Sequence, residues 1–213
     1  MSYKIREATH SDIPSLIEVY FDAFGDHPVT RRVFNSNPEH VRKFWLDPLA
    51  SGLQKPTEHF LVLTDPNSAT PERIIAFGIW REFFTTESSP PPPAAYSWPK
   101  DADLACAEEF FGTVGEMHKK IMESRPHWYL DILGVRGDSR GKGAGKQLLR
   151  WGIARADDAG LEAFLAASPA GAPLYAKHGF DLMDTVPLDN GNRLESFMMR
   201  PAKKVQVEPQ PST

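Results

Sequence analysis

The sequence predicts a single α/β domain. Short apolar runs typical of strands alternate along the chain with longer segments whose apolar residues recur at helical spacing. The chain has 213 residues, which suits one large domain, and 41% of them are hydrophobic, enough for a packed core. A glycine-rich turn also joins the apolar run 129–135 to an amphipathic segment that starts at Gly143. Strand, glycine turn and helix in this order are typical of α/β folds.

The first half of the chain is expected to contain two strands in a hairpin, preceded by a strand and two helices. Residues 9–12 supply capping side chains before the first helix. The expected elements are a strand at 3–8, a helix at 13–24, a helix at 38–54 that Pro48 interrupts or ends, and strands at 60–63 and 74–80. Four consecutive prolines make the segment 85–100 an expected extended loop.

The second half repeats the alternation of strand and helix and ends in a hairpin. The expected elements are a helix from 103 to just before Pro126, a strand at 128–135, helices at 143–159 and 172–177, and strands at 163–167, 180–186 and 194–200. Asn190-Gly191 between the last two strands is a strong hairpin signal. The polar, proline-rich residues 201–213 are expected to be a disordered tail.

Composition excludes several classes of protein. A net charge of −4 and a pI near 6.0 argue against nucleic acid as a partner. One cysteine permits no internal disulfide, which favours a cytoplasmic setting. No apolar run approaches the length of a membrane span, so no membrane partner is expected. The histidines do not cluster at metal-ligand spacing, and no metal is expected.

The stretch Arg140-Gly141-Lys142-Gly143-Ala144-Gly145 carries the clearest chemistry. Glycines let a backbone approach a phosphate, and the free amides and dipole of the following helix attract its charge. A P-loop is excluded because position 140 is Arg where a glycine is required, and Gln147 follows Lys146. The third glycine of a dinucleotide fingerprint would fall on Lys146 or Leu148. A phosphorylated cofactor bound by Arg-x-x-Gly-x-Gly is what remains.

That pattern, at the end of an apolar strand, resembles the acetyl-CoA pyrophosphate loop of the Gcn5-related N-acetyltransferase (GNAT) superfamily. Leu133-Gly134-Val135 resembles the family's strand end, and Leu174 to Phe180 resembles its L-Y-x-x-x-G-F segment. The resemblance implies one domain over residues 1–200, with a mixed, mostly antiparallel central sheet flanked by helices. It also implies acetyl-CoA as the co-substrate. Its motifs lie within 128–180, and the rest of the chain matches only in the order of its elements.

The resemblance assigns a set of cofactor contacts by position. In that family, strand amides hold the pantetheine and polarise the thioester carbonyl, while loop amides hold the pyrophosphate. The set here is Leu133, Gly134, Val135, Arg140, Gly141, Lys142, Gly143, Ala144, Gly145, Lys146, Ser168 and Tyr175. Gly134 is expected to mark a bulge or splay in its strand, or else simple tight packing. Gly137 stands where the family often has proline, so a looser turn is expected there.

Two residues are candidates for proton transfer. Tyr175 occupies the position of the tyrosine that protonates the departing thiolate in many family members. Asp131 lies on the cofactor strand, on the same face as Leu133 and Val135 if side chains alternate, and is a candidate general base. An ion pair is the alternative role for Asp131. Glu82, His127 or a water relay are the other candidates for the base.

The expected reaction is transfer of an acetyl group to a primary amine of a small molecule, by direct attack in a ternary complex. A protein or peptide acceptor and a non-catalytic acyl-CoA-binding module are the alternatives. The segment 127–133 also resembles small-molecule acetyltransferases of filamentous fungi. Aromatic residues near the expected acceptor side would suit an apolar amine: Phe21, Phe24, Phe44, Trp45, Phe83, Phe84, Tyr96 and Trp98. The sequence leaves the oligomeric state open.

Overall fold

The structure is a computed structural model that describes residues 3–35, 37–84 and 98–203. Most of the expected proline-rich loop, and the tail from residue 204 on, lie outside the described residues. The strands are β1 (Lys4–Glu7), β2 (Glu58–Thr64), β3 (Ile74–Phe83), β4 (His127–Val135), β5 (Glu162–Ala167), β6 (Asp181–Leu188) and β7 (Arg193–Arg200). All the strands expected from the sequence are therefore present, with ends that differ by a few residues.

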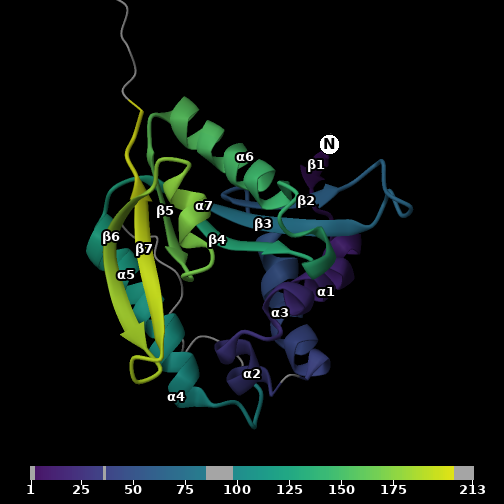
Figure 1. Cartoon of the computed structure of the whole chain (residues 1–213), viewed down its shortest axis with the longest axis horizontal. Coiled ribbons are helices and arrows are strands. Elements are labelled where there is room, and N and C mark those ends of the chain that lie inside the picture. The colour runs from purple at the N-terminus through teal and green to yellow at the C-terminus, as the bar shows by residue number, and fades with distance from the viewer. Residues whose placement is uncertain (1–2, 36, 85–97, 204–213) are drawn as a thin grey trace, which may run out of the picture.

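The strands form one sheet in the order β1-β2-β3-β4-β5-β7-β6 (Figure 1). Neighbouring strands are antiparallel except β4 and β5, which are parallel. The connection from β4 to β5 runs through a long helix, as a parallel pair requires. The expected mixed, mostly antiparallel sheet is confirmed.

The helices are α1 (Ile13–Phe24), α2 (Pro28–Phe34), α3 (Pro38–Gly52), α4 (Leu104–Ala107), α5 (Thr113–Met122), α6 (Ala144–Ala159) and α7 (Ala172–Ala176). A π-helical segment, Glu108–Gly112, joins α4 to α5. Two expectations were wrong: α2 was not expected, and Pro48 lies inside α3 without ending it. The α3 helix continues for four residues beyond Pro48, to Gly52.

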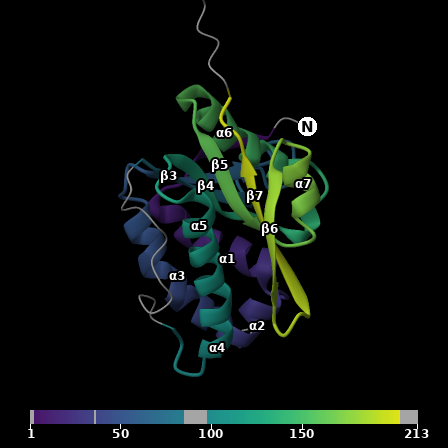
Figure 2. The same cartoon turned by 90° about the vertical axis from the view of Figure 1, so that its left-hand side faces the viewer.

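Helices cover both faces of the sheet. On one face, α6 packs Ala144, Leu148 and Leu149 against β2, β3 and β4. On the other face, α1, α2 and α3 cover β2 and β3, and α5 covers β4, β5 and β7. Figure 2 shows α5 in front of the sheet. The mixed sheet therefore has apolar cores on both sides. A ligand can reach it only at the ends and open edges of its strands.

A gap in the sheet lies between β4 and β5. The two strands pair only from His127 to Leu130 of β4, and their last pair is Leu130 with Leu165. Beyond it, β4 continues to Val135 along β3, while β5 continues to Ala167 along β7. Among the described residues, the edge of β4 that faces β5 therefore has no strand neighbour from Asp131 to Val135.

A β-bulge marks the start of this gap. Ile79 pairs with Ile132 and Trp80 pairs with Leu130, which leaves Asp131 as the extra residue of β4. The sequence had suggested Gly134 for this irregularity, but the register shift lies three residues earlier. A bulge bends and twists its strand. The bend at Asp131 coincides with the point where β4 and β5 part.

Candidate functional site

The loop between β4 and α6 has the geometry of an anion-binding turn. Gly141 and Gly143 have φ angles of +73° and +91°, a conformation that side chains other than glycine rarely adopt. A Cβ added at either residue would meet no atom of the described residues within 4 Å. The glycines are therefore required by backbone conformation, and the space beside them is open to a ligand.

The amides of residues 141–146 point to the same conclusion. In the described part of the chain, none of them donates to a protein acceptor; the first such bond of α6 runs from the Gln147 amide to the Gly143 carbonyl, at 3.2 Å. The amides at a helix start need acceptors from elsewhere, and the helix dipole favours an anionic one. The loop can therefore cradle a phosphate with main-chain donors alone.

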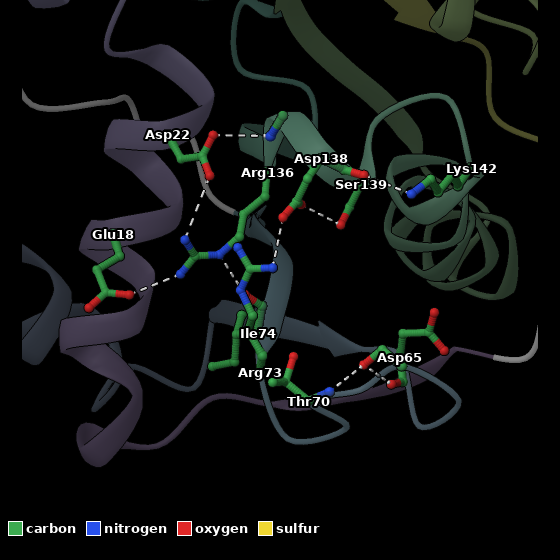
Figure 3. A network of polar contacts seen from close by, with 12 residues as sticks. Glu18, Asp22, Asp65, Thr70, Arg73, Ile74, Arg136, Asp138, Ser139 and Lys142 are labelled. Carbon is green, nitrogen blue, oxygen red and sulfur yellow. Dashed lines mark hydrogen bonds and ion pairs between the residues drawn. The ribbon is translucent and has the colours of Figure 1, made fainter.

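A polar network fixes the first part of this loop (Figure 3). The Arg136 guanidinium donates to Glu18 at 2.9 Å and to the Ile74 carbonyl at 2.9 Å. Asp22 of α1 accepts from the Gly137 amide at 3.0 Å, and Arg73 binds Asp138 at 2.8 Å. The turn after β4 therefore forms with Gly137 in the position where proline is common in the resembled family, because α1 holds it.

The three basic side chains of the loop differ in position. Arg140 donates to the carbonyls of Val135 at 3.3 Å and Ala23 at 2.8 Å, so its guanidinium braces the turn. Lys142 donates to the Asp138 carbonyl at 2.7 Å (Figure 3). Lys146 is exposed on the first turn of α6. The backbone amides are therefore the main candidates for phosphate contacts, and the lysines supply nearby positive charge.

The start of α6 packs directly on the open end of β4. Ala144 is buried, and a Cβ added at Gly145 would lie 3.4 Å from Val135 and 3.8 Å from Leu133. Leu133 and Val135 point toward α6, in the core on that side of the sheet. This packing holds the free amides of the loop beside the unpaired edge of β4, so a single extended ligand can reach both.

Gly134 is a packing glycine. A Cβ there would lie 2.9 Å from the Phe77 ring and 3.3 Å from the Phe24 ring. Tight packing, the alternative that the sequence left open for Gly134, is therefore present at the position that a side chain would occupy. Its backbone still belongs to the open stretch of β4, so a contact between that backbone and a ligand is compatible with the packing.

Asp131 does not share a face with Leu133 and Val135, contrary to the simple alternation expected from the sequence. The bulge reverses the alternation, and the charge of Asp131 acts on Tyr20 of α1, on the opposite side of the sheet. Its carboxylate forms an ion pair with Arg81 at 2.9 Å and is 24% exposed. The ion-pair role that the sequence left open is therefore present.

The other two candidates for the base lie at the far end of β4. His127 begins the strand, and its Nε2 lies 2.6 Å from Nε2 of His118. Glu82 pairs with Trp128 and is hydrogen-bonded to His59 at 2.5 Å. Both positions lie in the section where β4 is still paired with β5, away from the gap.

Tyr175 and Ser168 lie just beyond the end of β5. Tyr175 is buried on α7, and burial, with a contribution from the charge of Glu195, raises its pKa to about 12. Ser168 accepts a hydrogen bond from the Gly171 amide at 3.3 Å, which leaves its hydroxyl proton free to donate. Both residues follow the strand that forms the other side of the gap.

Sequence reasoning missed a group of residues on β7 and the α1–α2 turn. Glu195 is only 5% exposed, and its Oε2 has no hydrogen-bond partner in the described residues. Arg193 donates to Nε2 of His27 at 3.1 Å and lies 4.6 Å above the Phe110 ring. The signal was available: Glu195 shares its face of the strand with Phe197, so an acid stands where the pattern requires an inward side chain.

Several of the aromatic residues expected to line the acceptor site are buried in the core instead. Phe44 and Phe83 are buried in the two cores of the α1–α5 face, and Phe84 is exposed. Trp98 stacks on Phe44 with ring centroids 4.9 Å apart. Tyr96 lies outside the described residues. These aromatic residues therefore give no independent support to an apolar acceptor amine.

No group of three or more metal-ligating side chains occurs in residues 3–35, 37–84 and 98–203. Within the same ranges, no helix is long and apolar enough to cross a membrane.

Comparison with known proteins gives a consistent identification. Residues 78–180, from within β3 to just before β6, match the model of the acetyltransferase (GNAT) family. The L-methionine sulfoximine/L-methionine sulfone acetyltransferases of Pseudomonas aeruginosa and Pseudomonas paraeruginosa are 28% identical over 194 residues, covering 88% of this chain and 85% of theirs.

Solved structures agree on the fold. A histone acetyltransferase HPA2-related acetyltransferase from Corynebacterium glutamicum has a TM-score of 0.67 at 24% identity, covering 97% of this chain and all of its own. Arylalkylamine N-acetyltransferase 2 from Aedes aegypti has a TM-score of 0.68 at 14% identity, covering 94% and 99%. With the glycine-rich loop and the gap beside β4 in agreement with the family match, residues 78–180 form a GNAT-family acetyltransferase region, and that family uses acetyl-CoA.

Proposed function

We propose that the protein transfers the acetyl group of acetyl-CoA to a primary amine of a small molecule, by direct attack in a ternary complex. One observation carries the proposal: the free amides of residues 141–146 adjoin the open edge of β4. A phosphate donor site and an unpaired strand edge, side by side, suit a cofactor that carries a pyrophosphate and an amide-containing arm.

The residues fit acetyl-CoA in two stretches. The amides of residues 141–146 would bind the pyrophosphate, with Lys142 and Lys146 adding charge. The backbone of Leu133, Gly134 and Val135 would pair with the pantetheine amides, as a strand pairs with a β-strand ligand. Ser168, across the gap, can donate one further hydrogen bond. The same strand amides would lie beside the thioester carbonyl, where they can stabilise negative charge on its oxygen.

The chemistry requires a bond exchange and proton transfers. The neutral amine nitrogen attacks the carbonyl carbon, and collapse of the tetrahedral intermediate breaks the carbon–sulfur bond. The thiolate then needs stabilisation. With a pKa raised to about 12, Tyr175 stays protonated at neutral pH and can donate a hydrogen bond to the sulfur. Holding both reactants in place contributes much of the rate.

A covalent acyl-enzyme is disfavoured by the state of the cysteine. Cys106 is buried, and burial raises its pKa above its usual value. A thiol with a raised pKa forms little of the nucleophilic thiolate at neutral pH. Direct attack by the amine needs no such group.

A small acceptor is supported by contacts that tie the β6–β7 hairpin to neighbouring helices. Arg32 of α2 binds Asp189 at the hairpin tip at 2.8 Å, and Glu109 accepts from the Asp189 amide at 3.1 Å. These contacts, with Arg193 on His27, bring the hairpin against the α1–α2 region. The Pseudomonas relatives, whose names specify amino-acid-like acceptors, point the same way.

The test is release of free CoA thiol from acetyl-CoA across a panel of amines. The panel contains L-methionine sulfone, L-methionine sulfoximine, phenethylamine, spermidine, glucosamine and lysine peptides, with acetylated products identified by mass spectrometry. Turnover of a small amine supports the proposal. Turnover of peptides alone would replace it with peptide acetylation, and binding of acetyl-CoA without any turnover would leave an acyl-CoA-binding module.

A further inference from the structure

We propose that Glu195 accepts the proton that the acceptor amine must lose before it attacks. An amine arrives as an ammonium ion at neutral pH and cannot attack until a base removes a proton. This inference rests on the proposed function, because it assigns a role within that reaction.

Burial and the lack of a partner set Glu195 apart from the other carboxylates near the gap. Its side chain is only 5% exposed, and Oε2 has no hydrogen-bond partner in the part of the chain that the structure describes. A buried carboxylate normally has a cation or several hydrogen-bond donors. A buried, unpartnered oxygen calls for a ligand, and an ammonium group would satisfy it.

The position of Glu195 in the sheet puts it beside the gap. The pairing of β5 with β7 ends at Ala167 with Ser196, so Glu195 is the next residue of β7 beyond it. The charge of Glu195 acts on Tyr175, which comes from the helix just after β5. Glu195 is therefore close enough to Tyr175, the proposed hydrogen-bond donor to the sulfur, for its charge to affect that residue at the open end of the sheet.

The charged neighbours of Glu195 are few. On its own strand, Arg193 favours the ionised carboxylate, although its guanidinium is engaged by His27 and no ion pair joins it to Glu195 in the described residues. Beyond the end of β5, Tyr175 is neutral at pH 7. Two carboxylates of adjacent elements have other partners: Asp184 of β6 binds Lys120, and Glu109 binds the Asp189 amide.

These surroundings give Glu195 the properties of a base. Burial is the main cause that raises its pKa to about 7, while Arg193 opposes the shift. A general base works best when its pKa is near the operating pH. Two neighbouring groups whose pKa values are set far apart, here about 7 and about 12, form a natural base and acid.

In the proposed step, the Glu195 carboxylate takes one proton from the ammonium, and the freed nitrogen lone pair forms the bond to the carbonyl carbon. The nitrogen loses its second proton as the intermediate collapses, and the thiolate leaves as CoA. The overall reaction converts an ammonium and a thioester into an amide and a thiol, with one proton released to water. Asp131, the base suggested by the sequence, is already neutralised by Arg81.

The experiment compares pH–rate profiles of the wild type, Glu195→Gln and Asp131→Asn, with the most active amine of the panel. We expect Glu195→Gln to lower kcat/KM by about 100-fold or more. The wild-type profile should rise near pH 7 as Glu195 ionises. This limb should be absent from the Glu195→Gln profile, which should show only the pH dependence that the ionisation of the amine causes. The Kd of acetyl-CoA should stay unchanged, and Glu195→Asp should restore part of the rate.

A matched control is Glu162→Gln, the same substitution on β5 at the paired end of the sheet. Glu162 binds Arg125 there, so the variant should keep the wild-type profile. The inference is overturned if Glu195→Gln keeps the limb near pH 7, or if Asp131→Asn alone removes it. If the wild type acetylates no amine at all, the proposed function fails and this inference fails with it. Activity in the wild type with an unaltered Glu195→Gln profile would overturn the inference alone.

Discussion

Replacing Gly143 with alanine separates the conformational role of the loop from its role in binding. Gly143 has a φ of +91° with open space at the Cβ position, so Gly143→Ala introduces backbone strain without a clash. Left-handed conformation costs a non-glycine residue about 1–2 kcal/mol. For a chain of this length, that corresponds to a fall in Tm of about 2–8 °C.

The effect on cofactor binding should be separate and larger. The added methyl group would occupy the open space beside the free amides, where the pyrophosphate is proposed to lie. Loss of one amide–phosphate hydrogen bond costs about 1.5–3 kcal/mol, which weakens acetyl-CoA binding by about 10- to 100-fold. Isothermal titration calorimetry measures the Kd, and thermal unfolding measures the Tm.

Gly191→Ala is a closely matched control. Gly191 has a φ of +87°, nothing lies within 4 Å of its Cβ position, and it is in the β6–β7 turn. The two variants should lose similar stability, but only Gly143→Ala should lose affinity for acetyl-CoA. Equal affinities in the two variants would refute the assignment of the loop to the pyrophosphate.

Three other predictions test the site and its scaffold. Tyr175→Phe should lower kcat by about 100-fold and leave the Kd of acetyl-CoA unchanged, as stopped-flow and calorimetry would show; an unchanged kcat would remove the tyrosine from the chemistry. Burial lowers the pKa of His118 from 6.5 to about 3, so its contribution to stability is complete above pH 6.5 and is lost as the pH falls toward 3. Between pH 6 and 4, the free energy of unfolding measured in urea should fall with pH less steeply in His118→Phe than in the wild type, by about 1.4 kcal/mol per pH unit. Equal slopes in the two proteins would contradict this prediction. Gly152→Ala would place a Cβ 2.0 Å from the Trp80 ring, so α6 must shift at a cost of about 1–3 kcal/mol, and a Tm equal to that of the wild type would disprove this packing.

The periodic elements of this fold could be predicted from the sequence because their apolar residues face a core on one side. The α1 and α6 helices show this clearly, with Leu16 and Leu148 buried at helical spacing. The α2 helix has only seven residues, too few for a recognisable stripe. A proline favours the interruption or end of a helix, yet α3 continues past Pro48, so tertiary packing outweighs local preference there.

Within the candidate site, the sequence indicated the glycine-rich turn but not the residue proposed here as the base. The glycine spacing predicts a turn that can bind a phosphate, and the positive φ angles of Gly141 and Gly143 agree with the predicted turn. The bulge at Asp131 depends on how β3 pairs with β4, which no single strand reveals. Glu195 could have been noticed from strand alternation, but its burial and missing partner appear only when β5, β7 and α7 are assembled.

Amide NMR spectra of the protein titrated with CoA would test the central claim most directly. The account predicts the largest shift changes at residues 141–146 and along the open edge of β4, from Asp131 to Val135. The rival location is a depression of about 310 Å³ lined by Arg32, Glu109 and Asp189. Shift changes concentrated there, with the loop unaffected, would contradict the proposed binding of the cofactor.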